Sequence, residues 1–226
     1  MRKKKITVLV NKSAGHQSYV SLLEKRYEVT CIDCNEDLNA KIDLILFTGG
    51  EDVTPSYYNE SKGKFTSNND RRDILESDYM YNRRGLRMIP KLGICRGAQF
   101  LTVMNGGKLI QHVNNHAISG THALDMKYLQ DSDNFYITST HHQMMFPYNL
   151  DKEKYDILAT SRNFLSNTYL DGINQEKEIP KDFEECEIVF YPESRSLCIQ
   201  GHPEFSSCPE NTQYECLNLI ENYLNL

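Results

Sequence analysis

The sequence lacks an apolar run near the ~18 to 20 residues that a membrane-spanning helix needs, so we expect no membrane segment. The apolar stretch Ile6 to Val10 follows a basic start. It is shorter than the roughly 7 or more residues of a secretory signal core, and we interpret it as a first strand. Together these absences predict a cytoplasmic protein.

Basic charge is also scarce. The chain has 25 Lys and Arg residues against 31 Asp and Glu residues, for a net charge of −6. Such a chain has no general field for nucleic acid or anionic membranes, and we expect neither as a partner. The basic cluster Arg2 to Lys5 is interpreted as a solvated chain start. With 226 residues, 39% of them hydrophobic, and no repeat or shift in composition, we expect one domain over residues 1–226.

The cysteines form no regular disulfide framework. They number seven, an odd count, which predicts reduced thiols in the cytosol. Cys31 and Cys34 have the C-x-x-C spacing of redox or zinc sites, but no second pair completes a zinc set. The spacing of His112, His116 and His122 does not favour a metal site either, because no suitably spaced carboxylate or cysteine joins them. We therefore expect no metal and no cofactor.

What is present is an alternation of strand and helix patterns. Strands are expected over residues 5–10, 28–32, 42–47 and 88–94, and helices over 18–26, 71–86 and 96–104. Nearly continuous apolar runs such as 42–47 are typical of parallel strands buried on both faces. The alternation predicts an α/β fold with right-handed crossovers. Further strands are expected over 108–112, 135–139, 157–160, 187–191 and 196–200, before a closing helix with an apolar stripe from Tyr214 to Leu224.

The sharpest local pattern is Gly93-Ile94-Cys95-Arg96-Gly97, between an expected strand and an expected helix. It has the form of a nucleophile elbow with cysteine in place of serine. The small residues at either side permit a tight turn. The helix N-terminus favours a thiolate, and the next backbone N–H can stabilise an oxyanion. The pattern predicts Cys95 as a nucleophile.

A thiol nucleophile needs a base, and the base needs an orienting group. His202 and Glu204 follow an expected strand and lie two residues apart. In an extended or turning segment, Glu204 can reach the ring nitrogen that His202 does not use for the thiol. We therefore predict that His202 is the base and Glu204 its orienting carboxylate.

These pieces resemble the γ-glutamyl-γ-aminobutyrate hydrolase group of the class I glutamine amidotransferase superfamily, also called peptidase family C26. The matching motifs occur in the family's order across about residues 42 to 205. They are P-G-G-x-D-V-x-P-x-x-Y at 48–58, R-D-x-x-E at 72–76, the elbow signature within 90–112, H-H-Q at 141–143 and Q-x-H-P-E at 200–204. Thr48 stands where the family usually has proline, and Gly201 where it has a bulky residue.

The resemblance implies a flavodoxin-like α/β fold, with a central, mostly parallel sheet flanked by helices. It also implies a catalytic triad of Cys95, His202 and Glu204 that cleaves a γ-glutamyl amide through a thioester on Cys95. The other residues that the resemblance assigns to the oxyanion hole or to substrate binding are Gly49, Gly50, Arg96, Gln99, His141, His142 and Gln143.

Three functions stay open at this point. The first is a free-standing hydrolase that releases glutamate from a γ-glutamyl amine or a γ-glutamyl-nucleotide amidate. The second is a glutaminase that supplies ammonia to a partner synthetase as one of its subunits. The third, a non-catalytic protein on the same fold, is disfavoured by the complete triad. The expected partner is a small γ-glutamyl substrate, with a homodimer or a pathway enzyme left open. Asp52, Tyr57 and Tyr58 are expected in the substrate wall, and Arg71, Arg72, Arg83, Arg84 and Arg87 on a solvated helix face.

Overall fold

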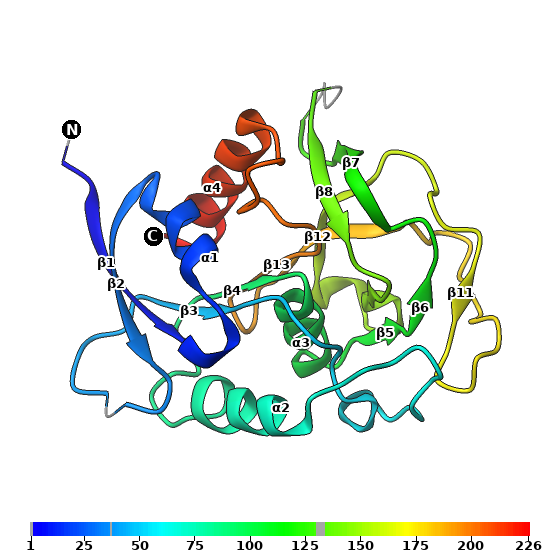
Figure 1. Ribbon diagram of the computed structural model, residues 1–226, viewed down its shortest axis with the longest axis horizontal. Coiled ribbons are helices and arrows are strands. Elements are labelled where there is room, and N and C mark those ends of the chain that lie inside the picture. Colours follow the sequence, from blue (N-terminus) through cyan, green and yellow to red (C-terminus); the bar gives the residue numbers. More distant parts are fainter. Residues whose placement is uncertain (1, 37, 130–133) are drawn as a thin grey trace.

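The computed structural model describes residues 2–36, 38–129 and 134–226. Within these ranges a nine-stranded sheet forms the centre, in the order β2-β1-β3-β4-β13-β12-β10-β7-β8 (Figure 1). The parallel half contains β2 (Tyr27–Asp33), β1 (Lys4–Val10), β3 (Leu44–Phe47), β4 (Lys91–Ile94) and β13 (Ser196–Ile199). The antiparallel half contains β12 (Cys186–Tyr191), β10 (Asp156–Ser161), β7 (Ala117–Met126) and β8 (Tyr136–Thr140).

Smaller elements border this sheet. Strand β5 (Lys108–Ile110) pairs with β9 (Met144–Phe146), and β6 (His112–Val113) pairs with β11 (Tyr169–Leu170). Short helical turns cover 12–14, 55–58, 147–149 and 152–154. Within the described ranges, none of the helices has the length and apolar character to span a membrane.

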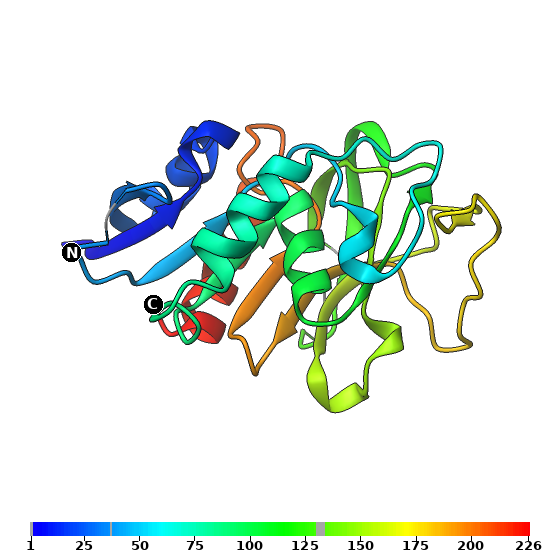
Figure 2. The same cartoon turned by 90° about the horizontal axis from the view of Figure 1, so that it is seen from below.

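Helices cover both faces of the parallel half (Figures 1 and 2). Helices α1 (Gln17–Glu24) and α4 (Glu210–Leu224) lie on one face, where Leu23 and Leu217 pack in one apolar cluster with strand residues. Helices α2 (Asp70–Glu76) and α3 (Arg96–Met104) lie on the other face, where Phe47 stacks on Phe100 at 5.4 Å. Strands β3 and β4 are buried throughout; β3 is wholly apolar, as burial on both faces favours, whereas β4 begins with the buried Lys91. The expected flavodoxin-like α/β architecture is therefore confirmed.

The structure differs from the sequence-based expectations at two places. The helix expected over 71–86 ends at Glu76 and continues only as a π-helical turn, Ser77–Tyr81. Strand β7 was not foreseen, because its sequence carries polar residues and Gly120, which has a positive φ of 146°. A shift in register against β8 lies between Ala117 and Thr121. Such irregular strands hide the alternation on which sequence patterns depend.

Candidate active site

Cys95 lies on a sharp turn between β4 and α3. Its backbone has φ 53° and ψ −113°, a left-handed conformation that only a tightly constrained non-glycine residue holds. The flanking glycines leave no room for a side chain. A Cβ on Gly97 would lie 2.0 Å from the Phe47 carbonyl oxygen, and one on Gly93 would lie 2.5 Å from the Gly97 carbonyl oxygen. The sequence thus folds into the expected elbow and places the thiol at the N-terminus of α3.

His202 and Glu204 follow β13, the strand that pairs with β4. His202 Nδ1 lies 2.6 Å from Glu204 Oε1, and the Glu204 side chain is fully buried. The Phe205 ring stacks on the imidazole with centroids 4.3 Å apart. The His202 backbone N–H donates to the Thr138 carbonyl of β8 at 3.2 Å. Carboxylate, aromatic ring and neighbouring strand therefore fix the imidazole in one orientation.

The imidazole of His202 lies beside Cys95: a Cβ on Gly49 would lie 3.1 Å from His202 Cε1 and 3.4 Å from Cys95 Cβ. Burial alone would lower the pKa of His202, but the hydrogen bonds with Cys95 and Glu204 outweigh it and raise this pKa to about 10. His202 therefore carries a proton at neutral pH. A protonated imidazole beside a thiol is an arrangement that favours a reactive cysteine.

Gly201 departs from the family pattern for a reason visible in the structure. A Cβ at this position would lie 2.7 Å from Thr138 O and from Ile137 Cγ1 of β8. Because β8 passes this closely, only glycine fits directly before His202.

The loop Thr48-Gly49-Gly50, called the oxyanion loop here after the role predicted for it, faces the elbow. Gly50 has φ 140°, and a Cβ there would lie 2.2 Å from Arg72 Nη1. The Gly49 N–H donates to the Tyr19 hydroxyl at 3.0 Å. Gly50, in contrast, lines the same pocket as Cys95. The Arg96 N–H at the start of α3 has no partner within the helix, as at any helix N-terminus.

Arg72 holds this loop in place. Its guanidinium donates to the carbonyl oxygens of Thr48 and Gly49, both at 2.9 Å. It is buried, so the expectation that Arg72 lies on a solvated helix face was wrong. Tyr19 is a further contributor that sequence reasoning missed, because its position in the apolar stripe of α1 indicates only a core residue.

A buried ionic network joins α2 to α3. Glu76 accepts from Arg72 Nε at 2.8 Å and from Arg96 Nη1, and Asp73 accepts from Arg96 Nη2. Burial raises the pKa of Glu76, but Arg96 and Arg72 outweigh it and hold this pKa below its usual range. Asp73 also accepts from the Thr54 backbone N–H at 2.8 Å. The R-D-x-x-E helix therefore supports both the oxyanion loop and the elbow helix.

Replacing Glu76 with glutamine is expected to destabilise the fold by about 3–5 kcal/mol, because two buried guanidiniums lose their shared counter-charge. Urea unfolding followed by circular dichroism measures the free energy of unfolding. The control is Glu28→Gln, which removes a carboxylate from the exposed pair with Lys5 and should leave the free energy of unfolding nearly unchanged. Equal stability of the Glu76→Gln protein and the wild type would show that the network does not support the fold.

A pocket of about 180 Å³ opens beside Cys95. It is lined by Gly50, Glu51, Asp52, Ser67, Cys95, Gln99 and Thr140 to Gln143. Gln99 Nε2 donates to the Gln143 carbonyl oxygen at 3.0 Å. His142 Nε2 lies 3.1 Å from Asp52 Oδ1, and this hydrogen bond raises the pKa of His142 despite partial burial. The structure thus brings Gln99, His142 and Gln143 into one pocket with Cys95.

Two groups of residues expected near the substrate lie differently. His141 borders the pocket, but its Nδ1 lies 2.8 Å from the Gln143 carbonyl oxygen and its Nε2 faces Glu187. Burial lowers the pKa of His141 to about 3, so it is neutral. Tyr57 and Tyr58 pack against the apolar core on the α3 side and are absent from the pocket lining, in the described part of the chain. Ser67 and Glu51 occupy the wall instead.

The fold and the elbow define the class of protein, and the comparison with known families agrees. The family model for Peptidase C26 matches residues 30–163, which is more than half of the chain. The chain therefore belongs to peptidase family C26, a family of hydrolases within the class I glutamine amidotransferase superfamily. The matched residues include the elbow and the oxyanion loop, whereas His202 and Glu204 lie beyond them.

Two curated proteins match this chain over about a third of its length. The glutamine amidotransferase-like protein RP404 of Rickettsia prowazekii is 37% identical over 87 residues, covering 37% of this chain and 30% of that protein. Protein NtpR of Enterococcus hirae is 31% identical over 77 residues, covering 34% and 32%. These matches span less than a third of either relative's length.

A solved structure from Thermoplasma acidophilum, described as a GMP synthase component, is similar with a TM-score of 0.61 at 15% identity. The superposition covers 100% of this chain and 94% of that chain. At this level of identity the likeness shows the fold alone.

Proposed function

We propose that the protein hydrolyses a γ-glutamyl amide through a thioester on Cys95 and releases glutamate. The observation that carries the proposal is the placement of Cys95, on its constrained elbow, beside the His202 imidazole, which Glu204 fixes from the other side. This is the arrangement of a nucleophile, its acid–base partner and an orienting carboxylate.

In the first half of the reaction the Cys95 thiolate attacks the γ-carbonyl carbon of the substrate. The carbonyl oxygen becomes an oxyanion, and the N–H groups of Gly50 and Arg96 are the donors that face it. His202, already protonated, gives its proton to the departing amine nitrogen. The C–N bond breaks, and the γ-glutamyl group remains on Cys95 as a thioester.

In the second half the now neutral His202 takes a proton from water, which attacks the thioester carbonyl. The same two N–H groups stabilise the second oxyanion. Collapse of this intermediate releases glutamate, and the thiolate–imidazolium pair is restored. Glu204 holds the imidazole in the tautomer that serves both halves and stabilises its charged form.

The pocket wall supports a leaving group larger than ammonia. Asp52, His142 and Gln143 present charged and amide groups around the space beside Cys95. Among the described residues, Gln143 Oε1 is buried without a hydrogen-bond partner. A site built to hydrogen-bond its ligand rejects a smaller analogue that leaves such groups unpaired.

We therefore expect kcat/KM for a γ-glutamyl amide with a polar or charged leaving group to exceed that for glutamine at least about tenfold, a difference of ~1.4 kcal/mol. Glutamate release would be measured with glutamine, γ-glutamyl-γ-aminobutyrate and a γ-glutamyl phosphoramidate nucleotide. The variant His142→Asn leaves Cys95, His202 and Glu204 in place but removes the imidazole beside Asp52. It should reduce the ratio of kcat/KM for the larger substrate to kcat/KM for glutamine. If glutamine were the best substrate, or activity required an added synthetase, the protein would instead be the glutaminase of a two-component synthetase.

A further inference from the structure

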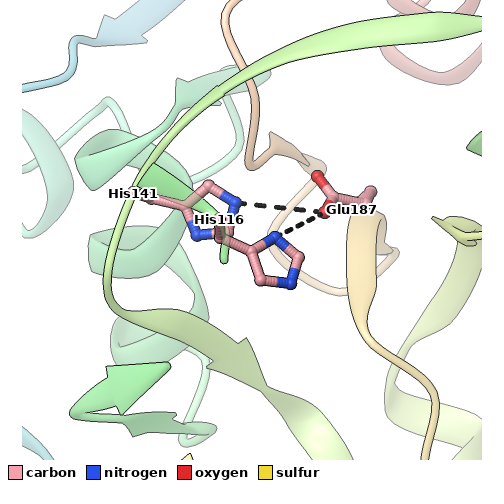
Figure 3. Close-up of side chains that lie close together, drawn as sticks. All are labelled: His116, His141 and Glu187. Carbon is pink, nitrogen blue, oxygen red and sulfur yellow. Dashed lines mark ion pairs between the residues drawn. The ribbon is translucent and has the colours of Figure 1, made fainter. Parts of the chain in front are cut away.

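A second cluster of chemically active side chains lies buried behind the pocket wall, in the antiparallel half of the sheet (Figure 3). His116 directly precedes β7, His141 directly follows β8, and Glu187 lies on β12. One ligand atom from each lies within 4.8 Å of the others. Sequence spacing did not indicate this group, because its members lie on or next to three separate strands. The histidine that lies near His116 is His141, not His112, which is closer in the sequence.

Hydrogen bonding fixes which nitrogen of each imidazole faces the cluster. His141 Nδ1 lies 2.8 Å from the Gln143 carbonyl oxygen, which can only accept, so Nδ1 carries the proton. His116 Nε2 lies 3.2 Å from Glu185 Oε2, an acceptor, and this contact favours the tautomer with the proton on Nε2. The remaining lone pairs, on His141 Nε2 and His116 Nδ1, point at Glu187 (Figure 3).

The centre of the cluster therefore consists of acceptors. His116 Nδ1 lies 3.6 Å and His141 Nε2 lies 3.9 Å from Glu187 Oε1. Neither nitrogen has a hydrogen-bond partner among the described residues, and Glu187 Oε2 also lacks one. Glu187 Oε1 itself accepts from Ser161 Oγ at 3.1 Å and lies 3.0 Å from His122 Nε2, so the unmet acceptors are the two imidazole nitrogens and Glu187 Oε2. Buried acceptors without a donor are unfavourable, and a cation between them removes the conflict.

We propose that His116, His141 and Glu187 bind a zinc ion. Two imidazoles and one carboxylate are ligands that Zn²⁺ takes, at about 2.0–2.1 Å, which places tetrahedral ligand atoms roughly 3.3–3.4 Å apart. The separations from Glu187 Oε1 are 3.6 and 3.9 Å, and all three ligand atoms lie within 4.8 Å of one another, so the side chains must draw together to bind the ion. Mg²⁺ and Ca²⁺ prefer oxygen ligands, so a site with two nitrogen donors disfavours them.

The groups around the three ligands have the arrangement typical of the surroundings of a bound metal. Metal-binding histidines donate their other ring N–H to a carboxylate or a backbone carbonyl, which raises their basicity and fixes their orientation. The Gln143 carbonyl does this for His141, and for His116 the carboxylate of Glu185 lies 3.2 Å from Nε2. His122 Nε2 lies 3.0 Å from Glu187 Oε1 and holds that carboxylate in place.

The position of the site indicates what the metal does. All three ligands are buried, so the ion serves to hold segments together rather than to bind substrate. His141 belongs to the pocket wall, and the Glu187 carbonyl accepts from the Gln200 backbone N–H at 2.8 Å, two residues before His202. Zinc at this place would fasten the substrate wall to the strand beside the catalytic histidine.

The test uses the full chain, with any affinity tag removed, expressed with added zinc and dialysed. Elemental analysis by plasma mass spectrometry should find about one zinc per chain, and Glu187→Gln and His116→Gln should each reduce this at least about tenfold. The matched control is His112→Gln, which removes an imidazole that stacks on Phe65 outside the cluster and should retain the zinc.

Because the variants could also fail to fold, the wild type supplies an independent measurement. Removing the metal with a chelator should lower Tm, and an equivalent of ZnCl₂, but not MgCl₂, should restore it. Less than about a tenth of an equivalent of zinc, with no change of Tm on chelation or zinc addition, would overturn the proposal and leave a His–Glu hydrogen-bond network. Equal zinc loss in His112→Gln would overturn the assigned ligands. None of these outcomes depends on the substrate.

Discussion

Replacing Cys95 with alanine is expected to lower kcat/KM at least about 10³-fold while leaving the fold intact, because the thioester can no longer form. The side chain is small and the elbow geometry comes from the backbone and its glycines, so alanine occupies the same position without new contacts. The measurement is the rate of glutamate release from the best substrate of the panel, together with Tm as a check on folding.

Covalent labelling tests the same prediction from another side. A diazoketone analogue of glutamine should modify one thiol per chain, and peptide mass spectrometry should place the label on Cys95. Cys31→Ala is the matched control, since this partly buried thiol lies on β2, away from the elbow, and its loss should change neither rate nor labelling. A Cys95→Ala protein with the wild-type rate would contradict the proposed nucleophile.

His202→Asn is expected to reduce kcat/KM to within about tenfold of the Cys95→Ala level, because the two residues act as one unit. Asparagine keeps a polar group of similar reach but cannot donate and accept a proton in turn. Gln213→Asn serves as the control, since it changes a buried amide near the same loop without touching the imidazole. Full activity of His202→Asn would remove the proposed acid–base partner.

The pH profile separates the role of Glu204 from that of His202. The His202 pKa is raised to about 10, so the imidazole carries its proton at neutral pH and loses it as the pH rises through that value. The alkaline limb of kcat/KM should therefore fall near this pH, with an apparent value that belongs to the Cys95–His202 pair. In Glu204→Gln a contribution that raises the His202 pKa is removed, and the alkaline limb should shift to lower pH.

Glu204→Gln should also be at least about tenfold more active than His202→Asn, because Glu204 orients the imidazole and transfers no proton. An unchanged alkaline limb in this variant would show that the 2.6 Å contact does not govern the charge of His202.

Local sequence patterns were sufficient to predict the parallel half of the fold and the elbow that carries Cys95. Its signals there are local: short apolar strands, helices that follow at once, and glycines on either side of Cys95. Each of these depends on neighbours within a few residues, where backbone conformation and side-chain period decide the structure. The same holds for His202 and Glu204, which are two residues apart and meet at the end of β13.

Contacts between segments that are far apart in the sequence could be seen only in the three-dimensional structure. The sequence pattern predicted Arg72 on a solvated helix face. In the structure α2 packs beside α3 and the oxyanion loop, and the guanidinium is buried there and donates to the Thr48 and Gly49 carbonyls. The sequence pattern around Tyr57 and Tyr58 predicted residues of the substrate wall, but in the structure both side chains pack against the apolar core. His116, His141 and Glu187 carry no shared spacing, because antiparallel strands far apart in the chain bring them together. Long-range strand pairing sets these contacts, and no local pattern encodes it.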